Sequence, residues 1–176
     1  MGAIRLIALA DEHIPAVIAA CADWEELSRH GPPYWRPRSP AELRRKVAAT
    51  AGPTLASDYT FVISRDGRLI GECSLHAIDW RNRVAQVGVC IWRPEDRGGG
   101  VGRAATRQII SWADNHLDLA RLEAWVVQDN EPSLRLFGSL GFLHEGTLRG
   151  RYVWDGDRRD MLVLGRLRPH KAQSGY

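Results

Sequence analysis

The chain of 176 residues is poor in cysteine and has no long apolar run. Its three cysteines, Cys21, Cys73 and Cys90, are scattered and form no Cys-x-x-Cys pair, which argues against a disulfide framework. No stretch approaches the roughly 18 apolar residues that a membrane-spanning helix needs. The first ten residues are followed at once by Asp11 and Glu12, which does not fit a signal peptide. We therefore expect a cytoplasmic protein without a membrane partner.

An excess of charge of one sign is also missing. The 24 basic and 21 acidic residues leave a formal net charge of +3, too little to require a nucleic-acid partner. All but two of the basic residues are arginine, which binds phosphate oxygens in a bidentate manner, so a phosphorylated ligand is compatible with the composition. The 17 glycines are unevenly placed, because four of them lie between Gly98 and Gly102.

Apolar periodicity and turn residues divide the chain into strands and helices. The first half predicts a strand at 4–8, a helix at about 13–27, a loop rich in proline and aromatic residues at 31–40, a helix at about 40–50, and antiparallel strands at 59–64, 69–78 and 84–92. The second half predicts a helix after the glycines, a strand at 122–127, a helix at about 131–140, strands at 142–149 and 160–166, and a polar tail at 168–176. This mixed α/β order, with a β-α-β crossover, predicts a single domain over residues 1–167.

The glycine-rich segment 97–102 lies between an apolar strand and an amphipathic helix. Such a junction directs unpaired backbone N–H groups and the positive end of a helix dipole at one spot, which suits a phosphate. The phosphate-loop pattern fails because no Lys-Ser or Lys-Thr pair follows, and the dinucleotide fingerprint fails because Arg103 replaces its third glycine. The spacing that fits is Arg-x-x-Gly-x-Gly, at Arg97, Gly100 and Gly102.

On this motif the chain resembles the GNAT superfamily of N-acetyltransferases, whose signature is Gln/Arg-x-x-Gly-x-Gly/Ala at a strand-to-helix junction. A second segment supports the resemblance, because it is similar to acetyltransferases of ribosomal-protein N-termini and also to those of spermidine and other small amines. Its matching residues are Asn130, Ser133, Leu140-Gly141-Phe142, Glu145-Gly146, Leu148-Arg149, Trp154-Asp155-Gly156 and Asp160.

The resemblance implies a GNAT fold, with a mixed, mostly antiparallel sheet of about seven strands that is splayed in the middle and flanked by about four helices. It implies acetyl-CoA as co-substrate in the wedge, and no metal. The pantetheine arm would pair with the strand that ends at Trp92 like an added strand, while the amides of 97–103 would hold the pyrophosphate. The implied cofactor-binding residues are Cys90, Ile91, Trp92, Arg97, Gly98, Gly99, Gly100, Val101, Gly102, Arg103, Asn130 and Ser133.

Acetyl transfer from a thioester to an amine needs a donor to the carbonyl and a proton for the departing thiolate. A backbone N–H near Ile91 or Trp92 is the expected carbonyl donor. Many GNAT proteins carry a thiolate-protonating Tyr at the position of Phe137, which has no hydroxyl. Ser133 is therefore the candidate catalytic replacement, although a serine that caps its own helix, with water at the thiolate, fits the same position.

The amine also has to lose a proton. Gln86 stands where related sequences often carry Glu, and Gln accepts no proton. Glu72 and His76 share one face of the preceding predicted strand and are the candidate catalytic bases. A base acting through water, or no dedicated base, remains open, and a lone strand histidine is also typical of packing.

By the same resemblance, the acceptor enters opposite the cofactor, against the first two helices and the last hairpin. Acidic residues beside aromatic ones in that region suit a cationic amine, although a solvated helix face with aromatic anchors fits the pattern too. The candidate acceptor-binding residues are Trp24, Glu25, Tyr34, Trp35, Gln86 and Tyr152.

Four functions follow from these observations. Acetylation of a protein N-terminus predicts an open groove, whereas acetylation of a small amine, such as a polyamine, antibiotic or toxin, predicts a closed acidic pocket. A nonenzymatic acyl-CoA-binding module is kept open by Phe137 and Gln86. A nucleotide-binding protein of another class is disfavoured by the motif spacing. The expected assembly is a monomer or homodimer.

Overall fold

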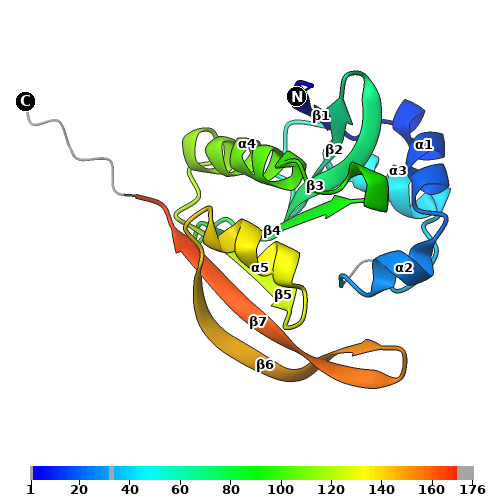
Figure 1. Cartoon of the computed structure of the whole chain (residues 1–176). Helices are drawn as coiled ribbons and strands as arrows, with labels where there is room; N and C mark the ends of the chain where they lie inside the picture. The colour runs from blue at the N-terminus through cyan, green and yellow to red at the C-terminus, as the bar shows by residue number, and fades with distance from the viewer. Residues whose placement is uncertain (1, 32–33, 170–176) are drawn as a thin grey trace, which may run out of the picture.

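The computed structural model describes residues 2–31 and 34–169, so Pro32 and Pro33 of the expected loop and residues 170–176 of the expected tail lie outside the described residues. Figure 1 shows the arrangement of the elements. They are β1 (Ile4–Ala8), α1 (Ile14–Ala20), α2 (Trp24–Ser28), α3 (Pro40–Ala49), β2 (Tyr59–Arg65), β3 (Arg68–Asp79), β4 (Val84–Ile91), α4 (Val101–Asn115), β5 (Arg121–Val127), α5 (Glu131–Gly138), β6 (Leu143–Trp154) and β7 (Asp157–Leu167), with short 3-10 turns at Asp11–His13 and Pro94–Asp96. Within this part of the chain, no helix is both long and apolar enough to cross a membrane.

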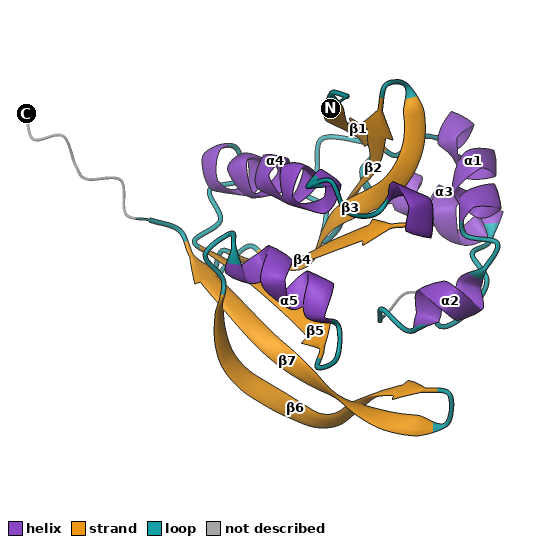
Figure 2. Ribbon diagram, viewed as in Figure 1, coloured by secondary structure: helices purple, strands orange, loops and turns teal. Residues whose placement is uncertain are grey.

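Seven strands form one sheet in the order β1-β2-β3-β4-β5-β7-β6 (Figure 2). Every neighbouring pair is antiparallel except β4 and β5. These two strands pair only between Val84–Gln86 and Arg121–Glu123, although both continue further. The expected splayed, mostly antiparallel sheet is therefore confirmed, with five α-helices in the described residues instead of about four.

The two faces of the sheet carry separate hydrophobic cores. Successive side chains of a strand point to opposite faces, and Ile63 of β2 packs in a core with α4 and α5, whereas Val62 packs in a core with α1 and α3. Figure 1 shows α1, α2 and α3 on one side of the molecule and α4 and α5 on the other. A ligand in the gap between β4 and β5 can therefore meet groups from both sides.

The single helix expected at about 13–27 is wrong, because the structure has two helices there. Cys21 leaves helical backbone geometry, with φ −100° and ψ 20°, and ends α1. The Asp23 carboxylate then caps α2 by accepting the Glu26 N–H at 3.0 Å. This capping aspartate is the sequence signal that marks the break, and it places α2 beside the glycine-rich segment.

The last hairpin is longer than expected, because the strands predicted at 142–149 and 160–166 extend to Trp154 and back from Asp157. Its turn contains Asp155 and Gly156, which both have positive φ, 51° and 79°. Such a two-residue turn matches the twist of paired strands and closes a hairpin tightly. The extension carries Tyr152 toward α2, where its hydroxyl donates to the Ser28 carbonyl.

Candidate active site

A cavity of about 1270 Å³ lies where β4 and β5 diverge. It brings most of the sequence-predicted site residues together. Those that line it are Tyr34, Trp35, Glu72, His76, Gln86, Cys90, Ile91, Arg97, Gly98, Gly100, Val101, Gly102, Arg103, Asn130, Ser133 and Tyr152, with Phe137 beside them. Among the described residues, the lining does not include four of the predicted ones, Trp24, Glu25, Trp92 and Gly99.

The glycine-rich segment forms a nest of backbone N–H groups at the start of α4. Gly98, Gly99 and Gly100 have φ of 78°, 55° and 75°, a left-handed run that side chains oppose. Within the described residues their N–H groups donate to no protein acceptor, whereas the N–H groups of Arg97 and Val101 are already bonded within the turn. A Cβ built at Gly98 or Gly99 meets no heavy atom within 4 Å, so the space beside these two glycines is open. Successive free N–H groups at a helix N-terminus suit a phosphate.

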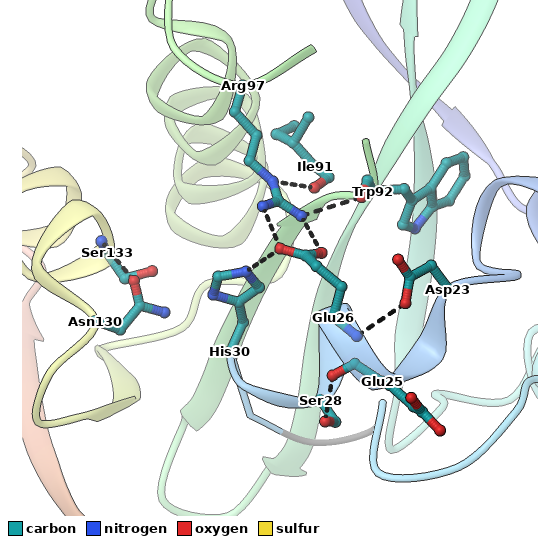
Figure 3. Close-up of polar contacts among 10 residues, drawn as sticks. All are labelled: Asp23, Glu25, Glu26, Ser28, His30, Ile91, Trp92, Arg97, Asn130 and Ser133. Carbon is teal, nitrogen blue, oxygen red and sulfur yellow. Dashed lines mark hydrogen bonds and ion pairs between the residues drawn. The ribbon is translucent and has the colours of Figure 1, made fainter. Parts of the chain in front are cut away.

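The side chain of Arg97 links the glycine-rich segment to α2 through an ion pair with Glu26. Its Nη1 and Nη2 donate to the two carboxylate oxygens of Glu26 at 2.7 and 2.8 Å, and the guanidinium also donates to the carbonyls of Ile91 and Trp92, each at 3.1 Å (Figure 3). These hydrogen bonds from Arg97 lower the pKa of Glu26 to about 2. Arg97 therefore acts as a structural clamp, and the donors of the nest that are free for a ligand belong to the main chain.

A second ion pair fixes the turn that precedes the nest. The Asp96 side chain is 1% exposed and accepts hydrogen bonds from Arg65 and Arg68, including one from Arg68 Nη1 at 3.0 Å. These arginines belong to the β2–β3 hairpin, so the turn is held against the sheet. A preorganised loop loses less entropy when it binds a ligand.

The open edge of β4 presents alternate residues to the cavity. The Trp92 N–H donates to the Ile70 carbonyl at 3.1 Å, so it is committed to β3. Because backbone groups alternate in an antiparallel pair, the N–H groups of Trp92 and Cys90 face β3, and those of Ile91 and Val89 face the gap. The expectation of a carbonyl donor or pantetheine partner at the Trp92 amide is therefore wrong, whereas the Ile91 amide remains a candidate.

At the start of α5, Asn130 and Ser133 line the same cavity. The Asn130 Oδ1 accepts the Ser133 N–H at 3.3 Å, so Asn130 is the helix N-cap (Figure 3). Within the described residues, the Asn130 amide nitrogen and the Ser133 hydroxyl have no protein partner. Phe137 is 4% exposed and stacks edge-on against Phe142, with ring centroids 5.1 Å apart. Among residues 130–137, Ser133 is the one residue with a hydroxyl group, and it lines the cavity.

Glu72 lies in a buried ion pair. The Arg38 Nη1 donates to its two carboxylate oxygens at 3.2 and 3.3 Å, and the Glu72 side chain is 8% exposed. Burial raises the pKa of Glu72, but the charges of Lys46 and Arg38 outweigh it and hold that pKa below its ordinary range. A carboxylate with a low pKa that is bound to arginine is a weak proton acceptor.

His76 occupies the same face of β3, opposite Gln86 of β4. Its Nδ1 lies 3.4 Å from the Ser74 Oγ, and a Cβ built at Gly88 would come within 3.4 Å of the ring, so glycine leaves room for it. Burial lowers the pKa of His76, so the ring is neutral at pH 7. A neutral imidazole in the cavity wall is able to accept a proton.

The remaining predicted acceptor residues divide into two groups. Tyr34 is buried and Trp35 is 60% exposed, and both line the cavity with Tyr152. Trp24 and the exposed Glu25 lie on α2, and the neighbouring Glu26 carries the contact with the nest instead.

Sequence reasoning missed several charged residues and one aromatic residue that line the cavity. They are Arg45, Lys46, Asp58, Trp125, Arg135 and Arg151. Charged residues on a short helix such as α3 look like an ordinary solvated face, so no local pattern separates Arg45 and Lys46 from Arg44. The long last hairpin, which was predicted too short, carries Arg151.

Comparison with known proteins agrees with this geometry. The profile of the family described as acetyltransferase (GNAT) domain matches residues 3–143, and the chain belongs to this family. It is 33% identical over 117 residues to an uncharacterised N-acetyltransferase, p20, of Bacillus licheniformis, which covers 66% of this chain and 65% of that protein. The chain thus spans slightly less than two thirds of that relative's length.

Solved structures share the fold at low sequence identity. RimL, a ribosomal alpha-N-protein acetyltransferase in complex with coenzyme A, superposes with a TM-score of 0.83 at 19% identity, over 93% of each chain. A spermidine N-acetyltransferase of Vibrio cholerae, in complex with coenzyme A and spermine, superposes with a TM-score of 0.80 at 22% identity, over 93% of this chain and 95% of that one. Both neighbours were solved with coenzyme A.

Proposed function

We propose that this protein is an N-acetyltransferase that moves the acetyl group of acetyl-CoA directly to a primary amine in a ternary complex. The observation that carries the proposal is one cavity that joins the glycine nest, the open edge of β4, Ser133 and His76. The acceptor is a protein N-terminus or a small amine.

Coenzyme A would bind through main-chain groups first. The free N–H groups of Gly98, Gly99 and Gly100 would hold the pyrophosphate, and the open N–H groups of β4 would pair with the pantetheine arm. The free amide nitrogen of Asn130 would donate to the same arm while its oxygen caps α5. The nest fits an anion because its amides are unpaired and nothing fills the space beside Gly98 and Gly99.

In the reaction, the amine nitrogen forms a bond to the thioester carbonyl carbon, and the carbon–sulfur bond breaks. We assign the Ile91 N–H to the carbonyl oxygen, because the Trp92 N–H is committed to β3. The neutral His76 would take the amine proton, directly or through one water, and Glu72 would remain in its ion pair with Arg38.

The departing thiolate would be stabilised by the Ser133 hydroxyl, with its proton drawn from solvent. One hydrogen bond to a charged group contributes about 1.5–3 kcal/mol, which suits a modest role for Ser133. Burial raises the pKa of the Cys90 thiol to about 12, so this cavity-lining cysteine is not a thiolate at neutral pH. Direct transfer therefore fits the cavity better than a route through an acetyl-cysteine.

The proposal is tested by incubating the protein with acetyl-CoA and a panel of amines, and by recording both free thiol and acetylated product. We expect equal amounts of the two with at least one amine, and a large loss in His76→Gln. The second candidate is an acyl-CoA-binding module, which the buried Phe137 without a hydroxyl favours. Tight acetyl-CoA binding with no product on any amine would favour that module.

A further inference from the structure

The cavity lining includes three cations that form no ion pair with a carboxylate among the described residues. Arg45 and Lys46 of α3 line the cavity, and so does Arg151 of β6. In the described part of the chain, none of the three forms an ion pair, and the Arg151 guanidinium lies 6.0 Å from the Trp125 ring centroid. An unpaired cation in a cavity wall is a ready partner for an anionic ligand group.

Acidic groups are fewer than basic groups in the lining of the same cavity. Asp58 accepts the Ser57 hydroxyl at 2.7 Å and the Ala77 N–H at 3.3 Å. Glu72 is held in its ion pair with Arg38. These are the two carboxylates among the described lining residues, against six lysine and arginine side chains, so the cavity lining carries a net positive charge.

The two cations on α3, Arg45 and Lys46, are separate from the glycine nest. Leu43 places α3 in the core with Val62, on the face opposite to the core that α4 shares with Ile63. The charge of Lys46 acts on Glu72 and on His76, which lie on the β3 face that α3 covers. Lys46 and the proposed base His76 therefore line the cavity from the same face of the sheet, on the side where the acceptor would enter.

We infer that the acceptor is a primary amine that carries a carboxylate near its amino group, and that Lys46, supported by Arg45 and Arg151, binds this carboxylate. The inference rests on the proposed function, because it names the substrate class of the same cavity. A polyamine is disfavoured by this wall, since Arg45, Lys46 and Arg151 form no ion pair and Asp58 is the one lining carboxylate, among the described residues, without an arginine partner. The carboxylate is that of a free α-amino acid or of an acidic residue next to a peptide N-terminus.

The test compares acceptors that differ in that carboxylate, with kcat/KM expressed per neutral amine because a carboxylate also raises the pKa of the amine beside it. Free amino acids are set against their amides, and peptides with Asp or Glu in the second position against the Asn or Gln versions, with spermidine as a cationic arm. A charged hydrogen bond supports a preference of about tenfold or more in kcat/KM for the acid of each pair. The pair that shows the larger preference distinguishes the amino acid from the acidic peptide.

Lys46→Gln should reduce this preference about tenfold through the acceptor KM, and Lys46→Glu should reverse it, while the Kd of coenzyme A stays unchanged. Arg45→Gln is the second variant, because Arg45 is exposed and its loss cannot disturb the Glu72 ion pair. Arg44→Gln is the matched control, since Arg44 is exposed on the same helix and lies outside this cavity. We expect it to behave like the parent protein.

Calorimetry on the protein loaded with coenzyme A separates this inference from the proposed function. Binding that favours the acid over the amide, without any acetyl transfer, would contradict the function and support the carboxylate site. Transfer at equal or higher kcat/KM to amides or spermidine would overturn the carboxylate site and leave the function standing. An unchanged preference in both Lys46→Gln and Arg45→Gln, or a weakened coenzyme A affinity in Lys46→Gln, would also overturn it.

Discussion

The glycine nest gives the most quantitative prediction, through the substitution Gly98→Ala. Gly98 has φ 78° and a Cβ built on it meets nothing within 4 Å, so the methyl group would stand in the open space where a phosphate is expected. Loss of one hydrogen bond between an amide and a charged phosphate costs about 1.5–3 kcal/mol. At 1.4 kcal/mol for each tenfold change, the Kd of coenzyme A should rise roughly 10- to 150-fold.

Gly156→Ala provides a matched control for this substitution. Gly156 has φ 79°, its built Cβ also meets nothing within 4 Å, and it lies in the β6–β7 turn outside the cavity lining. Both alanines suffer the same left-handed backbone strain, about 1–2 kcal/mol, partly offset by the stiffer unfolded chain. Thermal unfolding should therefore report similar stability losses, whereas calorimetry with coenzyme A should show weaker binding only for Gly98→Ala. Equal coenzyme A affinities in the two variants would refute the assignment of the nest.

The remaining predictions concern proton transfer and the Arg97 clamp. His76→Gln should lower kcat/KM about 100-fold. Because burial lowers the pKa of His76, the activity of the parent should fall off on the acid side at a lower pH than an exposed histidine would give, and this acid limb should vanish in the variant. An acid limb that persists in the variant would exclude His76 as the base. Ser133→Ala should lower kcat about tenfold with little change in the KM of acetyl-CoA, and a kcat within twofold of the parent would remove Ser133 from the mechanism. Glu26→Gln should lower the free energy of unfolding by about 0.5–1 kcal/mol after solvent screening. Since Arg97 depresses the pKa of Glu26 to about 2, this stabilisation is present above the ordinary carboxyl pKa and is lost as the pH falls toward 2. The free energies of unfolding of parent and variant, measured with denaturant, should therefore become equal near pH 2. A stability difference that stays constant down to pH 2 would contradict the clamp.

Much of the fold was predictable because its signals are local. Each of these signals depends on only a few neighbouring residues. They are the turn glycines, the Ser39-Pro40 start of α3 and the apolar alternation along β2 to β4. The break between α1 and α2 was missed because a run of helix-forming residues continues through Cys21 and hides the cap at Asp23. The length of the last hairpin was missed because many arginines interrupt the apolar alternation between Arg149 and Asp160.

The site was predictable where a motif fixes backbone geometry, as in the nest and at the start of α5. It was less predictable where a side chain finds a partner far along the chain. Arg38 reaches Glu72 over 34 positions and Arg97 reaches Glu26 over 71, and both contacts change what those carboxylates can do. The direction of the Trp92 amide depends on how β3 and β4 are aligned with each other. The residue pattern of one strand does not determine that register.

The central claim is that one cavity binds acetyl-CoA and passes its acetyl group to an amine. Mass spectrometry of the acceptor, run together with a thiol assay on the same sample, tests it most directly. The account predicts one acetylated amine for each thiol released, at a rate far above that of the uncatalysed mixture. It would be contradicted by a protein that binds acetyl-CoA in the cavity and leaves every amine of the panel unmodified.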